Sequence, residues 1–270
     1  LVAGVTALDM RVRAGDPDPQ EIEFELVGNN AVSLIQGDNA GGKLQAMFEY
    51  RDVHLKNAIA EFDQLAMGIS SVLNDAQAEG LNLQGLQGVN IFTDINATDV
   101  QIARVIESAN NGSNQVGQLN ITDMSLLPAN EFQINYDGAN YVMTDLSTNA
   151  TTVLGAAGGG TYATAFGFEF IETSGGPPVA GDVFLLRPTQ GGAAHIDVTM
   201  NQPSGIAAST AVEIIQSEHN ISDGGLEISS VVDPVAARAL APLRVEVLEN
   251  PVGTWNYQVF NDTTNALITG

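Results

Sequence analysis

The side chains best suited to catalysis or metal binding are scattered along this sequence. Its three histidines, His54, His195 and His219, lie in three different segments, so no local spacing places two of them on one metal ion. The chain has no cysteine, which excludes disulfides, thiolate zinc sites and a cysteine nucleophile. We therefore predict that the chain holds no metal.

Other catalytic signatures are incomplete. The 32 acidic residues permit a carboxylate pair of the glycosidase kind, but aromatic residues, which usually form sugar platforms, are only 6% of the chain. Gly41-Gly42-Lys43 resembles part of a phosphate-binding loop, but the earlier glycine and a following Ser or Thr are missing, so it fits a helix start better. We predict no catalytic residues, no cofactor and no enzyme activity.

Composition excludes several classes of partner. Acidic residues outnumber basic ones by 32 to 9, giving a net charge of −23, which disfavours nucleic acid and anionic membranes. No apolar run approaches the ~20 residues of a membrane span, and no signal peptide is visible. The chain begins at Leu1 without Met and stops at Gly270 within a strand-like pattern, so we expect an internal segment of a longer protein.

The first third of the chain predicts a β-meander followed by one long helix. Residues 8–13, 22–26 and 31–35 alternate or run apolar, with a turn at 15–19 whose Asp16 and Asp18 favour an ordinary turn over a calcium loop. From Lys43 to Glu79, apolar residues recur at steps of three and four, with a wider gap around Arg51-Asp52. We expect Arg51 to bond main-chain carbonyls there.

The apolar stripe predicts partners for this helix. It is expected to bury mainly the following residues: Leu44, Phe48, Leu55, Ile59, Phe62, Leu65 and Ile69. A small meander cannot cover a helix of that length, and no other segment of the chain is comparable. Part of the stripe should therefore be exposed here, and its partners should lie elsewhere in the protein or on other subunits.

The remainder predicts antiparallel β structure. Turn signals punctuate residues 91–200, and Asp137-Gly138 between two strand-like runs is a hairpin signal. A constant shift in numbering lays Asn140-Tyr141 on Asn256-Tyr257 and residues 148–150 on 264–266, which indicates a duplicated β domain. After a linker-like stretch, strand-like runs restart at 212–215, 226–228 and 243–247.

The fold class is therefore α+β, mostly β: one long amphipathic helix with a small meander, followed by antiparallel domains of the sandwich or barrel kind. We expect an inner domain over residues 1–92, a middle β domain over 93–210 and the start of a second, outer β domain over 211–270.

Residues 41–92 resemble the FlgK family of flagellar hook-associated proteins. The pattern is G-G-x-L, then R-D and Leu, then L-A, an Asn, and a glycine-punctuated loop ending in Phe. It is carried by Gly41, Gly42, Leu44, Arg51, Asp52, Leu55, Leu65, Ala66, Asn74, Gly80, Leu83, Gly85, Gly88 and Phe92. Asn82 departs from the family's usual Asp. Residues 132–138 and 181–188 resemble the family's middle domain.

This resemblance implies a structural subunit at the junction of flagellar hook and filament, with terminal helices that are not part of this sequence. It implies a homo-oligomeric ring, contacts with the hook protein and a second junction protein, and a flagellar export chaperone. It also implies export to the cell exterior without a cleaved signal, which suits a chain without cysteine. The alternatives are a secreted adhesin or surface-layer β-domain protein, and another flagellar axial protein.

Overall fold

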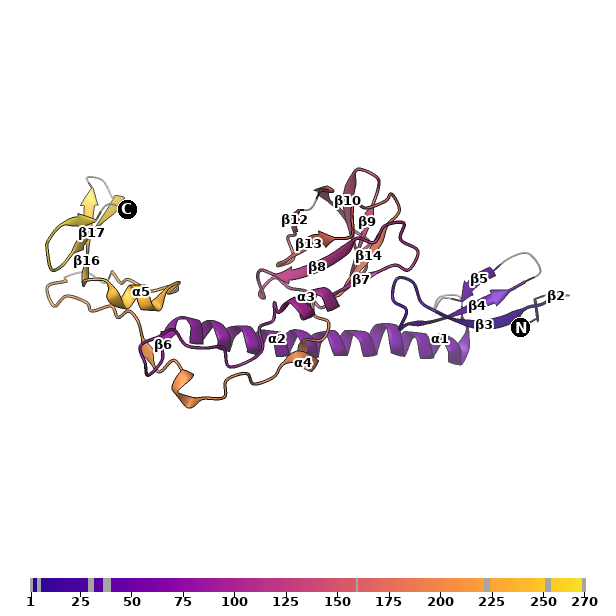
Figure 1. Cartoon of the computed structure of the whole chain (residues 1–270), viewed down its shortest axis with the longest axis horizontal. Helices are drawn as coiled ribbons and strands as arrows, with labels where there is room; N and C mark the ends of the chain where they lie inside the picture. Colours follow the sequence, from indigo (N-terminus) through magenta and orange to yellow (C-terminus); the bar gives the residue numbers. More distant parts are fainter. Residues whose placement is uncertain are drawn as a thin grey trace. The chain divides into compact units, whose positions relative to one another are not determined.

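The computed structural model describes residues 2–3, 6–28, 32–35, 40–158, 160–220, 224–250 and 254–268 (Figure 1). The chain divides into two compact units, each built from two stretches of sequence. The first unit joins Leu1–Ser71 to Thr93–Asp197, and the second joins Val72–Phe92 to Val198–Gly270. A single helix contributes residues to both units.

The first unit begins with the predicted meander. Strands β3 (Asp9–Ala14), β4 (Ile22–Val27) and β5 (Val32–Ile35) form a three-stranded antiparallel sheet, so the prediction of a small meander is confirmed. A two-residue ladder of β1 (Val2–Ala3) and β2 (Thr6–Ala7) precedes it. The ring of Phe24 on β4 meets the ring of Phe48 edge-on at 5.7 Å.

The long helix follows where it was predicted. It consists of α1 (Gly42–Glu49), a π-helical segment η2 (Tyr50–Leu55) and α2 (Lys56–Ala78). Glu49 and Lys56, which flank η2, keep right-handed helical backbone angles, so the three pieces are continuous. The wide gap in apolar spacing at Arg51-Asp52 thus coincides with wider helical turns, which accommodate extra residues.

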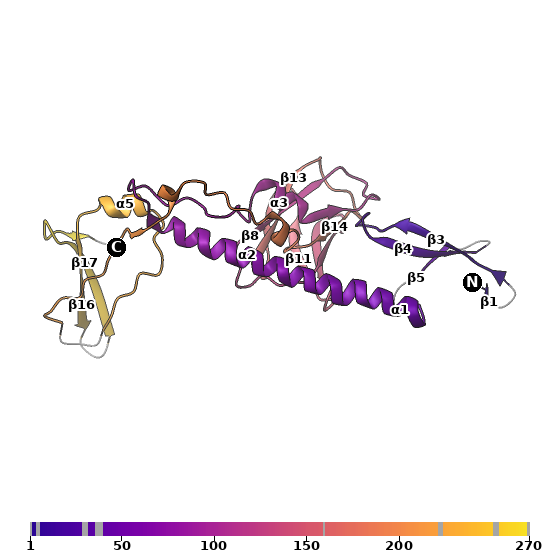
Figure 2. The same cartoon turned by 90° about the horizontal axis from the view of Figure 1, so that it is seen from below.

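The β domain of the first unit contains eight strands and two short helices. Its elements in chain order are α3 (Thr98–Ala103), β7 (Val105–Glu107), β8 (Val116–Ile121), β9 (Phe132–Tyr136), β10 (Asn140–Asp145), β11 (Thr151–Ala156), β12 (Thr161–Ala163), β13 (Phe168–Ser174), β14 (Val183–Leu186) and α4 (Gly192–His195). One antiparallel sheet has the order β11-β10-β9-β14-β7 and the other β12-β13-β8. Both sheets lie on one side of α2 (Figures 1 and 2).

The inward-facing residues of the two sheets form one core. Alternate positions of β8, β9 and β10 are buried, as a sheet with one covered face requires. The largest fully buried apolar side chains of the sheets are Leu119, Phe132, Ile134, Tyr141, Met143, Phe168, Phe170, Phe184 and Leu186, and Met67 of α2 joins them. The hairpin predicted at Asp137-Gly138 connects β9 to β10, with Tyr136 opposite Tyr141. The α+β, mostly β, fold class is confirmed.

The second unit contains short elements around the end of α2 and a separate C-terminal sheet. Its elements are β6 (Gly80–Leu81), a 3-10 turn η3 (Pro203–Gly205), β15 (Ser209–Thr210), α5 (Pro234–Ala239), β16 (Leu243–Asn250), β17 (Thr254–Asn261) and β18 (Leu267–Ile268). Strand β6 pairs with β15, and β16, β17 and β18 form an antiparallel meander. The run at 243–247 is therefore a strand.

The two other runs of this region were predicted wrongly as strands. Residues 212–215 and 226–228 belong to no helix or strand. Alternating apolar residues form a strand only where a neighbouring strand accepts their main-chain hydrogen bonds, and no described strand pairs with either run.

Candidate assembly surface and its anchoring contacts

The Gly41-Gly42 pair starts the long helix. Gly41 is its extended N-cap residue, and Gly42 has φ +60, an angle that favours glycine because it has no Cβ. Leu44, three residues into the helix, is half-buried. These positions explain the G-G-x-L pattern by backbone geometry, and the glycines serve to turn the chain into the helix.

Arg51 lies on the π-helical segment and reaches the meander. Its Nη1 donates to the main-chain oxygen of Ile22 on β4 at 2.9 Å, so the predicted bond to a carbonyl is confirmed. Its Nε and Nη2 donate to the two carboxylate oxygens of Asp52 at 2.5 and 2.9 Å. This hydrogen bonding raises the pKa of Arg51 above its usual value, against the opposing effect of burial. The guanidinium also lies 5.2 Å from the ring centre of Phe48.

A cluster of charged groups anchors the meander to the β domain. Arg187, which follows β14, donates to Asp18, to Glu21 at 2.5 Å and to Glu131 at 2.5 Å. Lys56 at the start of α2 donates to Glu21 at 2.5 Å. The cluster therefore ties the turn after β3, the helix and the β domain together with five charged side chains.

Asp18 is the most buried acid of this cluster, at 6% exposed. Burial alone would raise the pKa of Asp18, but the hydrogen bonds from the main chain of Gln20 and from the Arg187 guanidinium outweigh it and lower the pKa. Nearby, Asp16 accepts hydrogen bonds from Ser108 Oγ at 2.6 Å and from Asn110 Nδ2 at 2.7 Å. Both acids of the predicted turn thus bond to the β domain.

The face of α2 that meets the β domain is largely polar. Asp63, at 7% exposed, accepts hydrogen bonds from the main-chain nitrogens of Gly191 and Ala193 at 3.2 and 2.8 Å. Gln64 Nε2 donates to the main-chain oxygen of Leu127, and Ser70 Oγ donates to that of Thr93 at 2.9 Å. These main-chain groups lie in loops or in the first turn of α4, where they have no ladder partners and need side chains to satisfy them.

The apolar side of the helix faces away from this contact. From here on we restrict the name apolar stripe to the five of its residues that lie on this side: Leu55, Ile59, Phe62, Leu65 and Ile69. All five are exposed, Phe62 at 68% and Leu65 at 59%. The prediction that part of the stripe would be exposed in this chain is confirmed, and the exposed part is larger than expected because mostly polar side chains take the inner face. Of the residues predicted to be buried, Phe48 is, at 6% exposed, because Phe24 of the meander covers it.

Asn74 is buried at the end of the helix within the second unit. Its side-chain amide exchanges two hydrogen bonds of 3.0 Å with the main chain of Phe92. Asn82, which departs from the family pattern, accepts hydrogen bonds from the nitrogens of Gln84 and Leu86 through its side-chain oxygen. An aspartate would offer the same acceptor, so the departure preserves the turn.

The glycines of this loop are required by space or by backbone angle. A Cβ on Gly80 would lie 2.7 Å from the Cβ of Ala207, and one on Gly88 would lie 2.4 Å from the oxygen of Gln77. Gly85 has φ +74, which few other residues adopt. The structure places most of the family motif at the start and at the end of the long helix, with Leu65 and Ala66 in the middle of α2. The glycines and Asn74 fix the conformation of the chain at the two ends.

Arg187 and Asp63 were not predicted from the sequence as anchoring residues. Arg187 stood in a stretch already noted for its family resemblance, but its partners Asp18 and Glu131 lie far away in sequence. Asp63 sits inside the helical pattern, where an acidic residue normally indicates a solvent-facing position. No local signal shows that either side chain is mostly buried.

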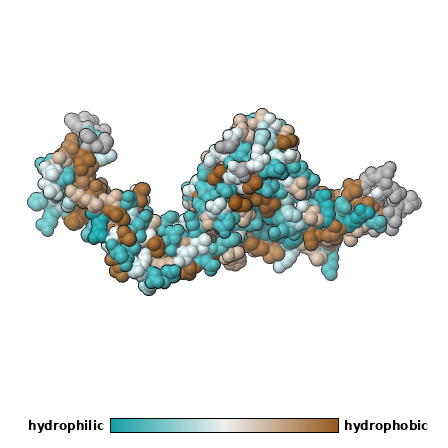
Figure 3. Space-filling model, viewed as in Figure 1, coloured by the Kyte–Doolittle hydropathy of each residue, from teal (hydrophilic) through white to brown (hydrophobic). Residues whose placement is uncertain are grey.

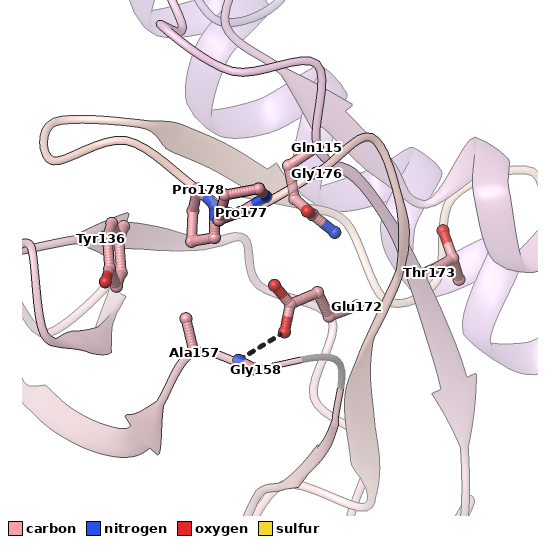
Figure 4. A pocket seen from close by; sticks show the side chains of 9 residues that line it. All are labelled: Gln115, Tyr136, Ala157, Gly158, Glu172, Thr173, Gly176, Pro177 and Pro178. Carbon is pink, nitrogen blue, oxygen red and sulfur yellow. Dashed lines mark hydrogen bonds between the residues drawn. The ribbon is translucent and has the colours of Figure 1, made fainter.

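The β domain also has an open pocket of about 360 Å³ (Figure 4). Its lining includes Tyr136, Pro177 and Glu172. The Glu172 carboxylate accepts hydrogen bonds of 3.1 Å from the hydroxyls of Tyr141 and Tyr162 and from the main-chain nitrogen of Gly158. Burial, with the neighbouring carboxylate, raises the pKa of Tyr162 to about 12. These contacts connect the two sheets at the pocket floor.

The described part of the chain offers neither a group of metal ligands nor a membrane-spanning helix. No group of three or more His, Asp or Glu side chains within those residues could hold a metal ion. Over the same residues, no helix combines the length and apolar character needed to cross a membrane.

Two family profiles match the chain, one over its N-terminal third and one over the β domain. The profile of the "Flagellar hook-associated protein FlgK helical domain" matches residues 1–92. The profile of the "Flagellar hook-associated protein 1, D2-like domain" matches residues 106–188. The two matches together span more than half of the chain.

Individual relatives agree with these matches. Flagellar hook-associated protein 1 of Escherichia coli (strain K12) is 22% identical over 233 residues, which are 85% of this chain and 41% of that protein. The structure of the flagellar hook junction protein FlgK from Burkholderia pseudomallei gives a TM-score of 0.63 at 25% identity, over 78% of this chain and 38% of that one.

A crystal structure of FlgL from Xanthomonas campestris gives a TM-score of only 0.26, at 15% identity over 60% of this chain and 73% of that one, which is too low to indicate a shared fold. The chain spans about two fifths of the length of the two FlgK relatives. With two family profiles matching in sequence order, and with the family's glycine and Asn74 positions explained by the structure, the chain belongs to the FlgK family of flagellar hook-associated proteins.

Proposed function

We propose that this chain is part of a structural subunit that joins the flagellar hook to the filament and has no catalytic role. The observation that carries the proposal is the apolar stripe on the helix. Five apolar side chains are exposed along one face, although the side chains of the opposite, buried face are polar except for Met67 and small residues. Such an arrangement is costly in water unless another helix covers the stripe.

Partners of the whole subunit follow from the same proposal. We propose that the subunits form a ring that contacts the hook protein on one side and a second junction protein on the other. An export chaperone would hold the unfolded subunit before export to the cell exterior. The absence of cysteine supports export in an unfolded state, because no disulfide can block threading.

The domain organisation is part of this proposal. Residues 1–92 form the inner domain, 93–210 the middle β domain, and 211–270 the start of an outer β domain. The family profiles over 1–92 and 106–188 support the first boundary. The Arg187 cluster and the Asp63 contacts would keep the middle domain at a constant angle to the helix, which a subunit that transmits torque between hook and filament requires.

Complementation tests the proposal. A strain lacking the gene receives the full-length gene carrying Phe62→Asp or Asn57→Asp. Both changes add one negative charge to exposed positions of α2, but only the first lies on the apolar stripe. We expect Phe62→Asp cells to make hooks without attached filaments, visible by electron microscopy, and Asn57→Asp cells to swim normally. Normal filaments in both strains would contradict the proposal.

A further inference from the structure

The C-terminal meander β16-β17-β18 resembles the meander β9-β10-β11 of the first unit, and the correspondence is closest in the second hairpin of each. Tyr141 and Tyr257, which the sequence repeat aligned, both lie on the middle strand of their meander. Asn149 and Asn265, aligned by the same shift, have φ 59 and 55 and are the non-glycine residues with positive φ in the described part of the chain. The predicted equivalence of these strands and turns is confirmed.

Hydrogen bonding shows the same correspondence. In the first turn, Asp145 N donates to Ala150 O at 2.9 Å and Asn149 N donates to Asp145 O at 2.7 Å. In the second, Asn261 N donates to Ala266 O at 2.9 Å and Asn265 N donates to Asn261 O at 2.8 Å. Each of these distances is reproduced to within 0.1 Å in the matching pair, so the two turns have one geometry.

The strand register after the turn also agrees. Thr144 lies opposite Thr151 in the first meander, and Phe260 lies opposite Leu267 in the second. Because these pairs are related by the same shift as the turns, the likeness extends from the turn into the ladder. A chance turn similarity would not fix the register of both flanking strands.

The two meanders differ in what covers them. In the first, Ile134 and Tyr141 are 0% exposed beneath the sheet β12-β13-β8. The ring of Tyr141 lies 5.5 Å from that of Phe170 on β13. In the second, Tyr257 is 73% exposed, and Val247, directly opposite it, is also exposed.

One face of the second meander is mostly apolar at its paired positions, although Asn261 lies opposite Leu243. Residues directly opposite one another share a face, so the ladder defines a set that we call the open face: Leu243, Val245, Val247, Tyr257, Val259 and Ile268. The other face is mixed: it carries Arg244, Glu246 and Gln258 together with Leu248, Phe260 and Leu267. Hydrophobic side chains are visible at the surface of this part of the chain (Figure 3).

We propose that the open face docks a β-hairpin with alternating aromatic residues, the counterpart of β12-β13, and so completes a second β-sandwich. In the first domain, Phe168 and Phe170 on the central strand β13 supply such residues to the core. The hairpin comes from the same polypeptide in the full-length protein. Its length supports this source, because the chain covers only 41% of its Escherichia coli relative.

Residues 226–228 provide a second reason to expect a hairpin equivalent to β12-β13 on the open face. They precede the second meander as β8 precedes the first, and Leu226 and Ile228 alternate as a strand would. In the first domain, β8 pairs with β13. Without a counterpart of β13, residues 226–228 have no strand to pair with, which explains why both apolar side chains are exposed and outside any strand.

Cysteine labelling tests this docking. The chain has no cysteine, so single variants report one position each. Tyr257→Cys and Val247→Cys place a thiol on the open face, and Gln258→Cys places one on the other face as a matched control. A maleimide dye is added to each variant, in this chain and in the full-length gene product freed of other cysteines.

In this chain, we expect all three thiols to react at similar rates. In the full-length protein, the thiols at 257 and 247 should react more than about 100-fold more slowly, because labelling then needs local opening, while the thiol at 258 stays fast. If one open-face variant fails to fold, the other gives the same test.

Fast labelling of both open-face positions in the full-length protein would overturn the proposal. Slow labelling in this chain that depends on its concentration would also overturn it, because a second copy would then be the occupant. Neither result depends on flagellar assembly, so failure here is distinct from failure of the proposed junction function.

Discussion

The side-chain amide of Asn74 pairs with the main chain of Phe92 as a neighbouring strand would. Nδ2 donates to the carbonyl oxygen of Phe92, and the nitrogen of Phe92 donates to Oδ1, both at 3.0 Å. Asn74 is buried, so neither group can turn to water when the pair is broken. This pair closes the loop after the helix back onto the helix.

Removing the amide should destabilise the second unit. We expect Asn74→Ala to lower the free energy of unfolding by about 1–3 kcal/mol, because two main-chain groups of Phe92 lose their partner. Asn74→Asp should cost a similar amount, since a carboxylate accepts from the nitrogen but repels the carbonyl oxygen. Urea unfolding measures both, with exposed Gln84→Ala as control; an unchanged midpoint for Asn74→Ala would contradict this role.

The charged cluster predicts an acid-sensitive contact between meander and β domain. Asp18→Asn should lower the free energy of unfolding by about 1–3 kcal/mol at neutral pH, because the largely covered Arg187 loses one of three carboxylate partners. Exposed Asp9→Asn on β3, the same chemical change, should be neutral.

The sign of the pH dependence follows from the direction of the Asp18 shift. The pKa of Asp18 is lowered from its usual 3.8, so its contribution is complete above the unfolded value and is lost as pH falls through the folded value. The stability difference between the parent chain and Asp18→Asn should be constant above about pH 5 and shrink below that. A difference that grows on acidification would contradict this assignment.

Arg104 predicts a substitution that stabilises the chain. Its side chain is 0% exposed, and its Nε and Nη1 have no hydrogen-bond partner among the described residues. Nη2 donates to the main-chain oxygen of Ile95 at 2.7 Å. Burial lowers the pKa of Arg104 to about 10, against the attraction of Asp94, which shows that its environment disfavours the charge.

We therefore expect Arg104→Met to raise the free energy of unfolding by about 2 kcal/mol. Methionine removes the cost of burying the guanidinium charge, and this gain exceeds the loss of the hydrogen bond to Ile95. Thermal and urea unfolding at pH 7 both measure it. A clear loss of stability would mean that the bond to Ile95 outweighs the cost of the buried charge.

The sequence predicted the long helix, the meander and the two-sheet domain because each depends on local periodicity. It also predicted the repeat, because Asn149 and Asn265 are turn residues whose left-handed geometry recurs in sequence. The direction of the apolar stripe was not predictable in this way. Periodicity shows that one helix face is apolar, but whether that face is buried depends on partners.

The anchoring contacts could not be predicted because they join residues that are distant in sequence. Asp18 and Arg187 are far apart in the chain, and neither carries a local signal of burial. The strand predicted at Leu226 and Ile228 is wrong for the same kind of reason. Their alternating pattern is that of a strand, but no strand among the described residues pairs with them. Long-range pairing thus accounts for both the missed contacts and the wrongly predicted strands.

The most direct test of the central claim compares one substitution on the apolar stripe in two settings. In this chain, Phe62→Ala should change the free energy of unfolding by less than about 0.5 kcal/mol, because the ring is exposed. In the full-length protein, it should cost about 3–5 kcal/mol, because the ring then packs in a helical core. Phe48→Ala, which removes a ring already buried here, should be costly in both. If Phe62→Ala is neutral in the full-length protein as well, the stripe is not an assembly surface.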